Sequence, residues 1–236
     1  KYIARMDSDD IALKDRLKLQ VEFMEKHTNF VVCGSWAKSF GFENKIIKTP
    51  VSNTDIINEM IVKSPIIHPT ALIKKEVLDK YNINYDEKFK HVEDYKLWYD
   101  LSKHGLLYNL PIILLEYRIS NNQVSYKYNN IQHLNTAIVR RLMLDDYLSS
   151  MNYKMYSVIN IDLLKFLFIQ LKKSTNNYKE RNIIYCIFFS LNKYSFKSLF
   201  IFLFSFIYFY KPFTFINFIK LLYKHINKNR WLPLIK

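Results

Sequence analysis

The chain has 236 residues, 50% of them hydrophobic, so it can bury one good-sized core plus an appendage and is not a disordered chain. Glycine occurs only at Gly34, Gly41 and Gly105, which excludes a glycine-rich phosphate-binding loop. Any phosphate must therefore be held by a metal or by basic side chains. The two cysteines, Cys33 and Cys186, have no metal or redox spacing and indicate a reducing compartment.

The net charge of +14 is unevenly distributed along the chain. Residues 1–127 contain 19 Lys and Arg against 17 Asp and Glu, a balance of +2. Residues 128–236 contain 16 against 4, a balance of +12. A polyanionic partner would therefore contact the C-terminal half of the chain.

An acidic cluster follows a short apolar run at the beginning of the chain and contains Asp7, Asp9 and Asp10. An extended segment would deliver this cluster to the end of a strand, the edge where ligands bind in open α/β sheets. Carboxylates this close repel one another, so a hard divalent cation is the simplest ligand. The alternative is a solvated turn, or a cap for a helix that begins near Lys14.

Two elements are predicted directly after the acidic cluster. Residues 15–26 have the pattern of an amphipathic helix, with Leu17, Val21 and Met24 on the face expected to pack on a sheet. Residues 30–36 are β-rich and bounded by polar residues, which predicts a buried strand.

A short helix is predicted over residues 53–61, and an apolar triplet follows at residues 71–73. Between them, residues 64–70 carry two prolines that restrict the backbone around His68. A lone histidine in such a segment is more often structural than catalytic.

A second acidic site stands at the start of another predicted helix. The apolar stripe over residues 97–101 and Gly105 as C-cap place Glu93 and Asp94 in the first turn. Acidic residues there are ordinary partners of the helix dipole. Alternatively, the helix presents one carboxylate to a cleft, where it accepts a proton from a hydroxyl group.

A turn over residues 108–111 is expected to lead into a strand over residues 112–118 that ends on Arg118. A polar loop over residues 119–125 follows it.

Taken in order and spacing, these segments resemble the bacterial family-2 glycosyltransferases, which have the GT-A fold. The acidic cluster, followed by Asp15-Arg16-Leu17 and Gln20, looks like the DxD region of that family. The resemblance covers about residues 1–127, and its later landmarks are His68-Pro69-Thr70, Glu93-Asp94-Tyr95-Lys96-Leu97-Trp98, Tyr117-Arg118 and Val124-Ser125.

The resemblance implies an α/β fold, a Rossmann-like GT-A core over residues 1–127 that lacks its first βαβ strands, and an all-helical extension over residues 128–236. It also implies a nucleotide-sugar donor, UDP-linked, and a divalent metal, Mn²⁺ or Mg²⁺, that bridges the donor diphosphate. The metal ligands that it implies are Asp9 and Asp7, and the donor-binding residues are Asp7, Asp9, Asp10, Arg5 and Arg118.

Catalysis in such enzymes depends on the Glu-Asp pair at the helix start. The resemblance assigns Asp94 as the general base and Glu93 as the residue that orients the acceptor, with His68 on the acceptor side. The reaction would be an inverting displacement, in which the acceptor hydroxyl loses its proton as the diphosphate leaves. The helix dipole is expected to keep Asp94 ionised near neutral pH.

Two departures from the family limit what can be carried over. The N-terminal strands that usually hold the nucleotide base are missing, which suggests an N-terminally truncated chain. Many relatives have a histidine where this chain has Ser120, so Arg118 is expected to carry more of the diphosphate binding.

The C-terminal extension matches no functional motif. Helices are predicted over residues 131–148, 163–171 and 183–191, and an uncharged aromatic segment lies at residues 198–210. As a helix, this last segment would span about 20 Å, short of the roughly 30 Å of a bilayer core. It is either a buried core helix or an interfacial segment on an anionic membrane.

The sequence therefore predicts a glycosyltransferase at the cytoplasmic face of a bacterial membrane, acting on a surface glycan such as lipopolysaccharide, capsule or exopolysaccharide, or on a lipid-linked acceptor. One alternative is a non-catalytic relative that binds or assembles. The other is a nucleic-acid-binding module, which the acidic sites disfavour because they would repel phosphates without a metal.

Overall fold

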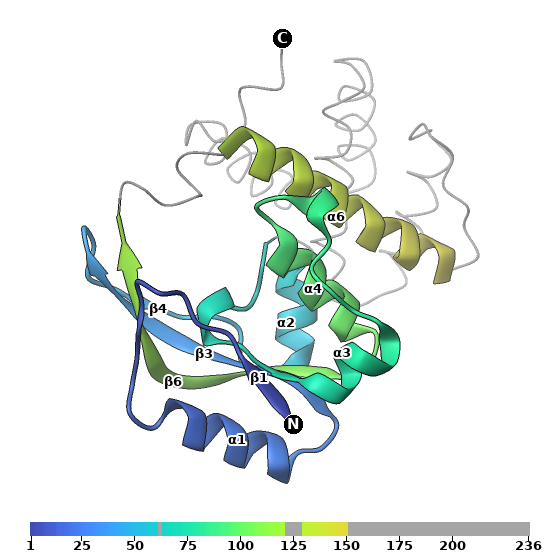
Figure 1. The fold of residues 1–236 in the computed structure, drawn as a ribbon. Helices are drawn as coiled ribbons and strands as arrows, with labels where there is room; N and C mark the ends of the chain where they lie inside the picture. The colour runs from blue at the N-terminus through green and yellow to red at the C-terminus, as the bar shows by residue number, and fades with distance from the viewer. Residues whose placement is uncertain (61–62, 121–128, 151–236) are drawn as a thin grey trace, which may run out of the picture. The chain divides into compact units, whose positions relative to one another are not determined.

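The computed structural model describes residues 1–60, 63–120 and 129–150. The chain divides into two units, Lys1–Met143 and Leu144–Lys236, and the fold below is that of the first (Figure 1). Its strands are β1 (Tyr2–Ala4), β2 (Ile11–Ala12), β3 (Phe30–Gly41), β4 (Ile46–Ile47), β5 (Leu72–Lys74) and β6 (Leu106–Ile119). Its helices are α1 (Arg16–Lys26), α2 (Asn53–Met60), α3 (Lys75–Tyr81), α4 (Glu93–Ser102) and α6 (Asn129–Ser150), with short 3₁₀ helices at His68–Thr70 and Glu87–Phe89.

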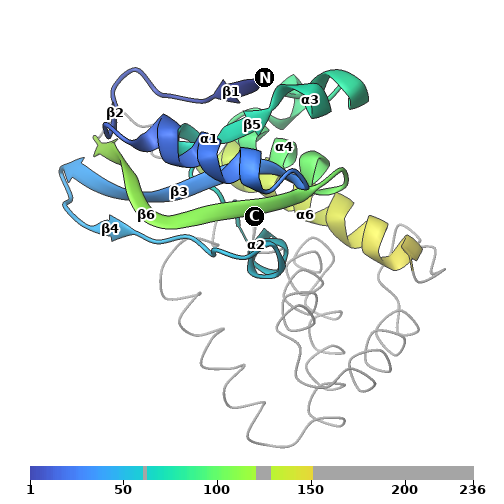
Figure 2. The ribbon, with the colours of Figure 1, turned by 90° about the horizontal axis from the view of Figure 1, so that it is seen from below.

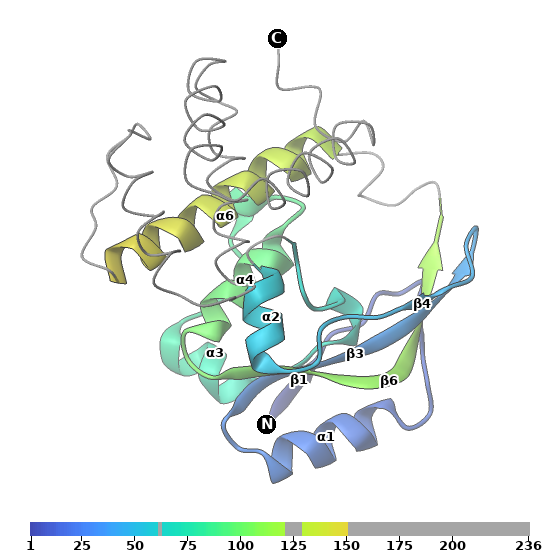
Figure 3. The ribbon, with the colours of Figure 1, turned by 180° about the vertical axis from the view of Figure 1, so that it is seen from behind.

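The strands form one mixed sheet in the order β1-β5-β3-β6-β2, and β4 pairs with β3. The two long central strands, β3 and β6, run parallel, whereas the pairs β1–β5, β3–β5, β2–β6 and β3–β4 are antiparallel. Helix α1 lies against β3 and β6 on one face of the sheet (Figure 2). Helices α2 and α4 cover the opposite face (Figure 3). The predicted α/β class is therefore confirmed.

The core is divided between the two faces of the sheet. The smaller cluster, on the α1 side, contains Met24, Cys33 and Leu72. The larger cluster lies on the α2 and α4 side, where burial of apolar surface stabilises the fold most. Its fully buried members include Val32, Ile56, Trp98, Leu101, Leu107 and Val139.

Helix α1 forms where the sequence predicts it, and two of the three residues expected on its inward face, Val21 and Met24, pack in the core cluster on that side of the sheet. Leu17 is 54% exposed, whereas Arg16 and Gln20 are buried. The Gln20 amide donates hydrogen bonds to the backbone carbonyls of Cys33, at 2.7 Å, and Thr70, at 2.8 Å. The buried polar side chain is thus satisfied, and it ties α1 to β3 and to the segment before β5.

The central strands are longer than predicted. Strand β3 runs on to Gly41, and β6 begins at Leu106, so the turn expected over residues 108–111 is wrong. Leu110 pairs with Ser35 and Ile113 with Trp36, so the two residues between Leu110 and Ile113 form a bulge. A proline, which has no N–H to donate, is tolerated inside a long strand at such a place.

Helix α4 has the predicted start, with Glu93 and Asp94 in its first turn. The predicted C-cap is wrong, because α4 ends at Ser102 and Gly105 does not adopt the left-handed conformation. Glycine is needed at 105 for packing instead, since a Cβ there would overlap the Val31 side chain.

The helix predicted over residues 131–148 is present as α6. The helices predicted over residues 163–171 and 183–191, and the segment 198–210, lie outside the described residues. Among the residues that are described, no helix has the length and apolar character needed to cross a membrane.

Candidate active site

The acidic loop, residues 5–10, joins β1 to β2 and is held from both sides by the sheet. Strand β1 pairs with β5, and the Arg5 N–H donates to the Ala71 carbonyl at 2.9 Å. Strand β2 pairs with β6, with Ile11 opposite Glu116. The loop is therefore fixed between the His68 segment, which leads into β5, and the end of β6.

Arg118 anchors the far end of the acidic loop. Its backbone N–H donates to Asp10 Oδ1 at 2.8 Å, its Nε donates to the Asp9 carbonyl at 2.9 Å, and its guanidinium lies 4.5 Å from the Phe40 ring centre. Arg118, predicted to bind the donor, thus also shapes the loop that carries the predicted donor ligands.

Asp10 is only 9% exposed, and its Oδ2 is buried without a hydrogen-bond partner. The pKa of Asp10 is raised to about 6, mainly by burial; the Arg118 N–H opposes this rise, and the charges of Asp7 and Asp9 add to it. The Asp9 side chain is exposed. Three carboxyl groups therefore share one loop; Arg5 pairs with Asp7 and the Arg118 N–H with Asp10, whereas Asp10 Oδ2 has no hydrogen-bond partner, which favours a cation.

The near end of the loop contacts His68. Arg5 forms an ion pair with Asp7 at 2.6 Å, and its Nε donates to His68 Nε2 at 3.2 Å. The Tyr85 hydroxyl lies 2.8 Å from the same nitrogen. Because the Arg5 Nε can only donate, His68 Nε2 must be the acceptor and the ring is neutral. Burial, and then the charge of Arg5, lower the pKa of His68 to about 4.

Asp94 is half-buried, and its Oδ2 accepts a hydrogen bond from the Ser64 hydroxyl at 3.3 Å. Burial raises the pKa of Asp94 to about 6, although the Tyr95 N–H and the Ser64 hydroxyl oppose the rise. Desolvation therefore outweighs the effect of the helix start on the pKa of Asp94. A carboxyl with this pKa is still about nine-tenths ionised at pH 7.

The acidic loop and the first turn of α4 contribute to one cleft, because Arg5 and Glu93 both line it. Tyr117, half-buried near the end of β6, has its phenol pKa raised by burial and then by the charges of Asp10, Asp7, Asp9 and Asp94. The chain thus brings both predicted carboxylate groups to one region.

A cleft of about 600 Å³ opens beside these groups. Glu93 is among the residues that line it, whereas Asp94 is not. The lining residues are Arg5, His68, Tyr85, Glu87, Lys90 and Glu93.

The sequence pointed to most of this site but not to all of it. Tyr117 belongs to a landmark of the resemblance, yet it was not expected among the site residues. Ser64, Tyr85 and Lys90 belong to no motif, and only the folded chain brings them to the cleft or to the predicted base.

The carboxylates suit a divalent metal of the predicted kind. Within the described residues, no three His, Cys, Asp or Glu side chains are grouped closely enough to hold a metal alone. Mg²⁺ is usually bound by only one or two protein carboxylates, together with substrate phosphates and water. Asp7 and Asp9 could provide these two carboxylates. The buried, unpartnered Oδ2 of Asp10 also fits a loop that gains from a cation.

Comparisons with known proteins give a family match and several relatives. Residues 1–82 match the family described as glycosyl transferase family 2. An uncharacterized glycosyltransferase of Haemophilus influenzae is 29% identical over 210 residues, covering 84% of this chain and 64% of that protein. The crystal structure of S. aureus TarS 1-349 covers 63% of this chain and 47% of its own, at 16% identity and a TM-score of 0.41. The structure of the same protein in complex with UDP covers 70% of this chain and 53% of its own, at 15% identity and a TM-score of 0.40.

Two further relatives have more specific names. The amylovoran biosynthesis glycosyltransferase AmsE of Erwinia amylovora is 30% identical, covering 52% of this chain and 47% of its own. The UDP-Gal:alpha-D-GlcNAc-diphosphoundecaprenol beta-1,3-galactosyltransferase of Escherichia coli is also 30% identical, and the match covers 50% of this chain and 44% of that protein.

The described residues form a mixed α/β sheet with helices on both faces, the class expected from the resemblance. The family match, over residues 1–82, and the named relatives make the chain similar to glycosyltransferase family 2. It spans about half to two-thirds of the length of the curated relatives it matches. The match to the Haemophilus protein covers 84% of the chain and so extends beyond residue 127 into the basic extension.

Proposed function

We propose that this chain carries the catalytic site of an inverting glycosyltransferase that moves a sugar from a nucleotide donor to a hydroxyl group of a surface glycan or lipid-linked acceptor. The observation that carries the proposal is the cleft that Arg5, from the acidic loop, and Glu93, from the first turn of α4, line together. The names of the amylovoran and galactosyltransferase relatives support a polysaccharide product and a UDP-linked donor.

On the donor side, Asp7 and Asp9 would hold Mn²⁺ or Mg²⁺, which when bound neutralises charge on the donor diphosphate. Arg5 lines the cleft and adds a fixed positive charge. Arg118 and the buried Asp10 keep the loop in place, because both groups bond within it. Binding of the diphosphate in this way requires no glycine-rich loop.

On the acceptor side, the ionised Asp94 carboxylate is the general base and Glu93, in the lining of the cleft, orients the acceptor. The proton of the acceptor hydroxyl passes to Asp94 while the oxygen of that hydroxyl bonds to the anomeric carbon. The bond from that carbon to the diphosphate breaks, and its electron pair stays on the diphosphate. His68 is neutral and positions Arg5 and Tyr85 at the cleft.

The balance of +12 over residues 128–236 supports a location at the inner face of the plasma membrane. Basic residues near an anionic bilayer each contribute about 1 kcal/mol of attraction. The acceptor would then reach the cleft from the lipid surface.

The direct test measures nucleotide release from a panel of UDP-, GDP- and dTDP-sugars in the presence of Mn²⁺. We expect consumption of at least one UDP-sugar, and loss of that activity when the metal is chelated. A protein that binds a donor with metal but never turns it over, with or without a glycan acceptor, would instead be a non-catalytic relative.

A further inference from the structure

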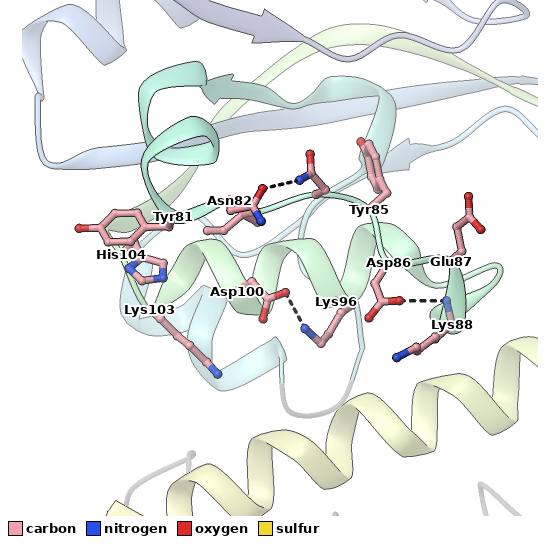
Figure 4. Close-up of a pocket in the computed structure, with 12 residues that line it drawn as sticks. Tyr81, Asn82, Tyr85, Asp86, Glu87, Lys88, Lys96, Asp100, Lys103 and His104 are labelled. Carbon is pink, nitrogen blue, oxygen red and sulfur yellow. Dashed lines mark hydrogen bonds and ion pairs between the residues drawn. The ribbon is translucent and has the colours of Figure 1, made fainter.

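A second groove, of about 700 Å³, lies beside the cleft, between the segment that follows α3 and helix α4 (Figure 4). No role described so far uses it. It is lined by Tyr81, Asn82, Ile83, Asn84, Tyr85, Asp86, Glu87, Lys88, Lys96, Asp100, Lys103 and His104.

The charges in this groove balance, with three lysines against three acidic residues. Lys96 and Asp100 form an ion pair at 2.5 Å, and Lys103 lies 4.2 Å from the Tyr99 ring centre. Asp86 accepts a hydrogen bond from the Lys88 N–H at 3.0 Å. A groove without net charge gives little attraction to a phosphate and favours a neutral, polar ligand.

One end of the groove carries a stacked aromatic pair. The rings of Tyr81 and His104 lie with centres 3.7 Å apart at 17°, Lys80 Nζ lies 5.2 Å from the Tyr81 ring centre, and both Tyr81 and His104 are exposed. Beside them, Asn82 adopts the left-handed conformation and accepts a hydrogen bond from the Asn84 amide at 3.3 Å. Exposed rings next to amides suit a sugar, whose C–H face stacks on a ring while its hydroxyls bond to amides.

The groove and the cleft share a wall. Tyr85 and Glu87 line both, and the Tyr85 hydroxyl contacts His68 in the cleft. Figure 4 shows the side chains of Tyr85 and Glu87 pointing away from Lys96 and Asp100 on α4. A chain of sugar units lying in the groove could therefore continue past this wall to Glu93.

We propose that the groove binds neutral sugar units of the acceptor glycan that adjoin the unit receiving the new sugar. This inference rests on the proposed function, because it is the acceptor of that reaction that occupies the groove. The stacked Tyr81–His104 pair is the platform, and Asn82 and Asn84 select the orientation of the sugar.

The test is binding of neutral saccharides to the whole chain without donor, measured by saturation-transfer NMR and titration. The probes are methyl β-galactoside, lactose, maltose and N,N′-diacetylchitobiose. We expect Tyr81→Ala to weaken binding about five- to tenfold, the range for losing one aromatic contact. Tyr81→Phe keeps the ring face and should stay within about twofold.

Two further variants keep the test decisive. Leu17→Ala, an exposed position on α1, is the matched control and should not change binding. Asn84→Ala replaces an exposed amide and should weaken binding even if Tyr81→Ala proves unstable in a thermal melt.

The inference is overturned if no probe binds the wild type, or if Tyr81→Ala and Asn84→Ala bind as the wild type does. Binding of inorganic phosphate that depends on Tyr81 would also overturn it. Donor consumption by the wild type without saccharide is measured separately. If that fails while binding still depends on Tyr81, the proposed function is wrong and the groove remains a sugar site.

Discussion

Replacing Asp94 by asparagine should make the protein more stable while removing most of its activity. Burial raises the pKa of Asp94 from its ordinary 3.8 to about 6. Each pKa unit corresponds to about 1.4 kcal/mol, so keeping this carboxyl ionised at pH 7 costs up to about 3 kcal/mol of folding free energy. Because the side chain is only half-buried, water reduces this to about 1–2 kcal/mol.

The raised pKa of Asp94 also determines how the stability difference between wild type and Asp94→Asn changes with pH. A carboxyl with a raised pKa in the folded state favours folding while it is protonated, and that contribution is lost as the pH rises through about 6. Asp94→Asn should therefore gain about 1–2 kcal/mol above pH 6 and nothing near pH 4. The Ser64 hydroxyl can still donate to the amide oxygen, so its hydrogen bond need not be lost.

The activity should change in the opposite direction. An amide cannot accept the acceptor proton, so Asp94→Asn should lower kcat by about two to four orders of magnitude and leave donor affinity unchanged. In the wild type, kcat should fall below pH 6 as Asp94 is protonated. Urea unfolding at pH 4 and 7 and steady-state rates with a working acceptor measure both effects.

Glu93→Gln is the matched comparison, because Glu93 lines the cleft and Asp94 does not. Its cost should fall mainly on acceptor KM. If Glu93→Gln loses turnover while Asp94→Asn keeps it, the base has been assigned to the wrong carboxylate. Equal stability of the wild type and Asp94→Asn at pH 7 would refute the argument from burial.

Two other predictions concern the acidic loop and the extension. Asp9→Ala should abolish Mn²⁺-dependent donor binding in calorimetric titration. The thermal midpoint should stay the same, because the Asp9 side chain is exposed. Equal donor affinity of wild type and variant with metal present would contradict the metal assignment. Deleting residues 195–236 should release the protein from anionic vesicles, whereas salt should only weaken the binding of the wild type. If the deletion leaves co-sedimentation with vesicles unchanged, segment 198–210 is better explained as a buried core helix.

The order of the elements and most of the inward face of α1 could be predicted from the sequence, but the burial of Gln20 could not. Of the three residues expected to face the sheet, Val21 and Met24 do so and Leu17 is exposed, whereas the polar Gln20 is fully buried. The partners of Gln20 are carbonyls of β3 and of the segment before β5. Such partners come from distant parts of the chain, so no local pattern reveals them.

The site follows the same division. Its carboxylates could be predicted because their spacing and resemblance are local properties of the sequence. The pKa of Asp94 could not, because burial is a property of the folded chain and here it exceeds the effect of the helix start. Tyr85 lies at the cleft because its hydroxyl contacts His68, and no sequence motif indicates this contact.

The first helix of the extension contacts the turn that leads into helix α4, where the proposed catalytic carboxylates lie. His91 has φ of 70°, a left-handed conformation that costs a non-glycine residue about 1–2 kcal/mol. The Gln132 amide of α6 donates to the His91 carbonyl at 3.1 Å, and Asn135 donates to the Lys90 carbonyl at 2.8 Å. These bonds hold the turn that leads into Glu93. Because the Haemophilus relative matches beyond residue 127, we infer that the start of the extension is part of the active-site framework and not a separate attachment.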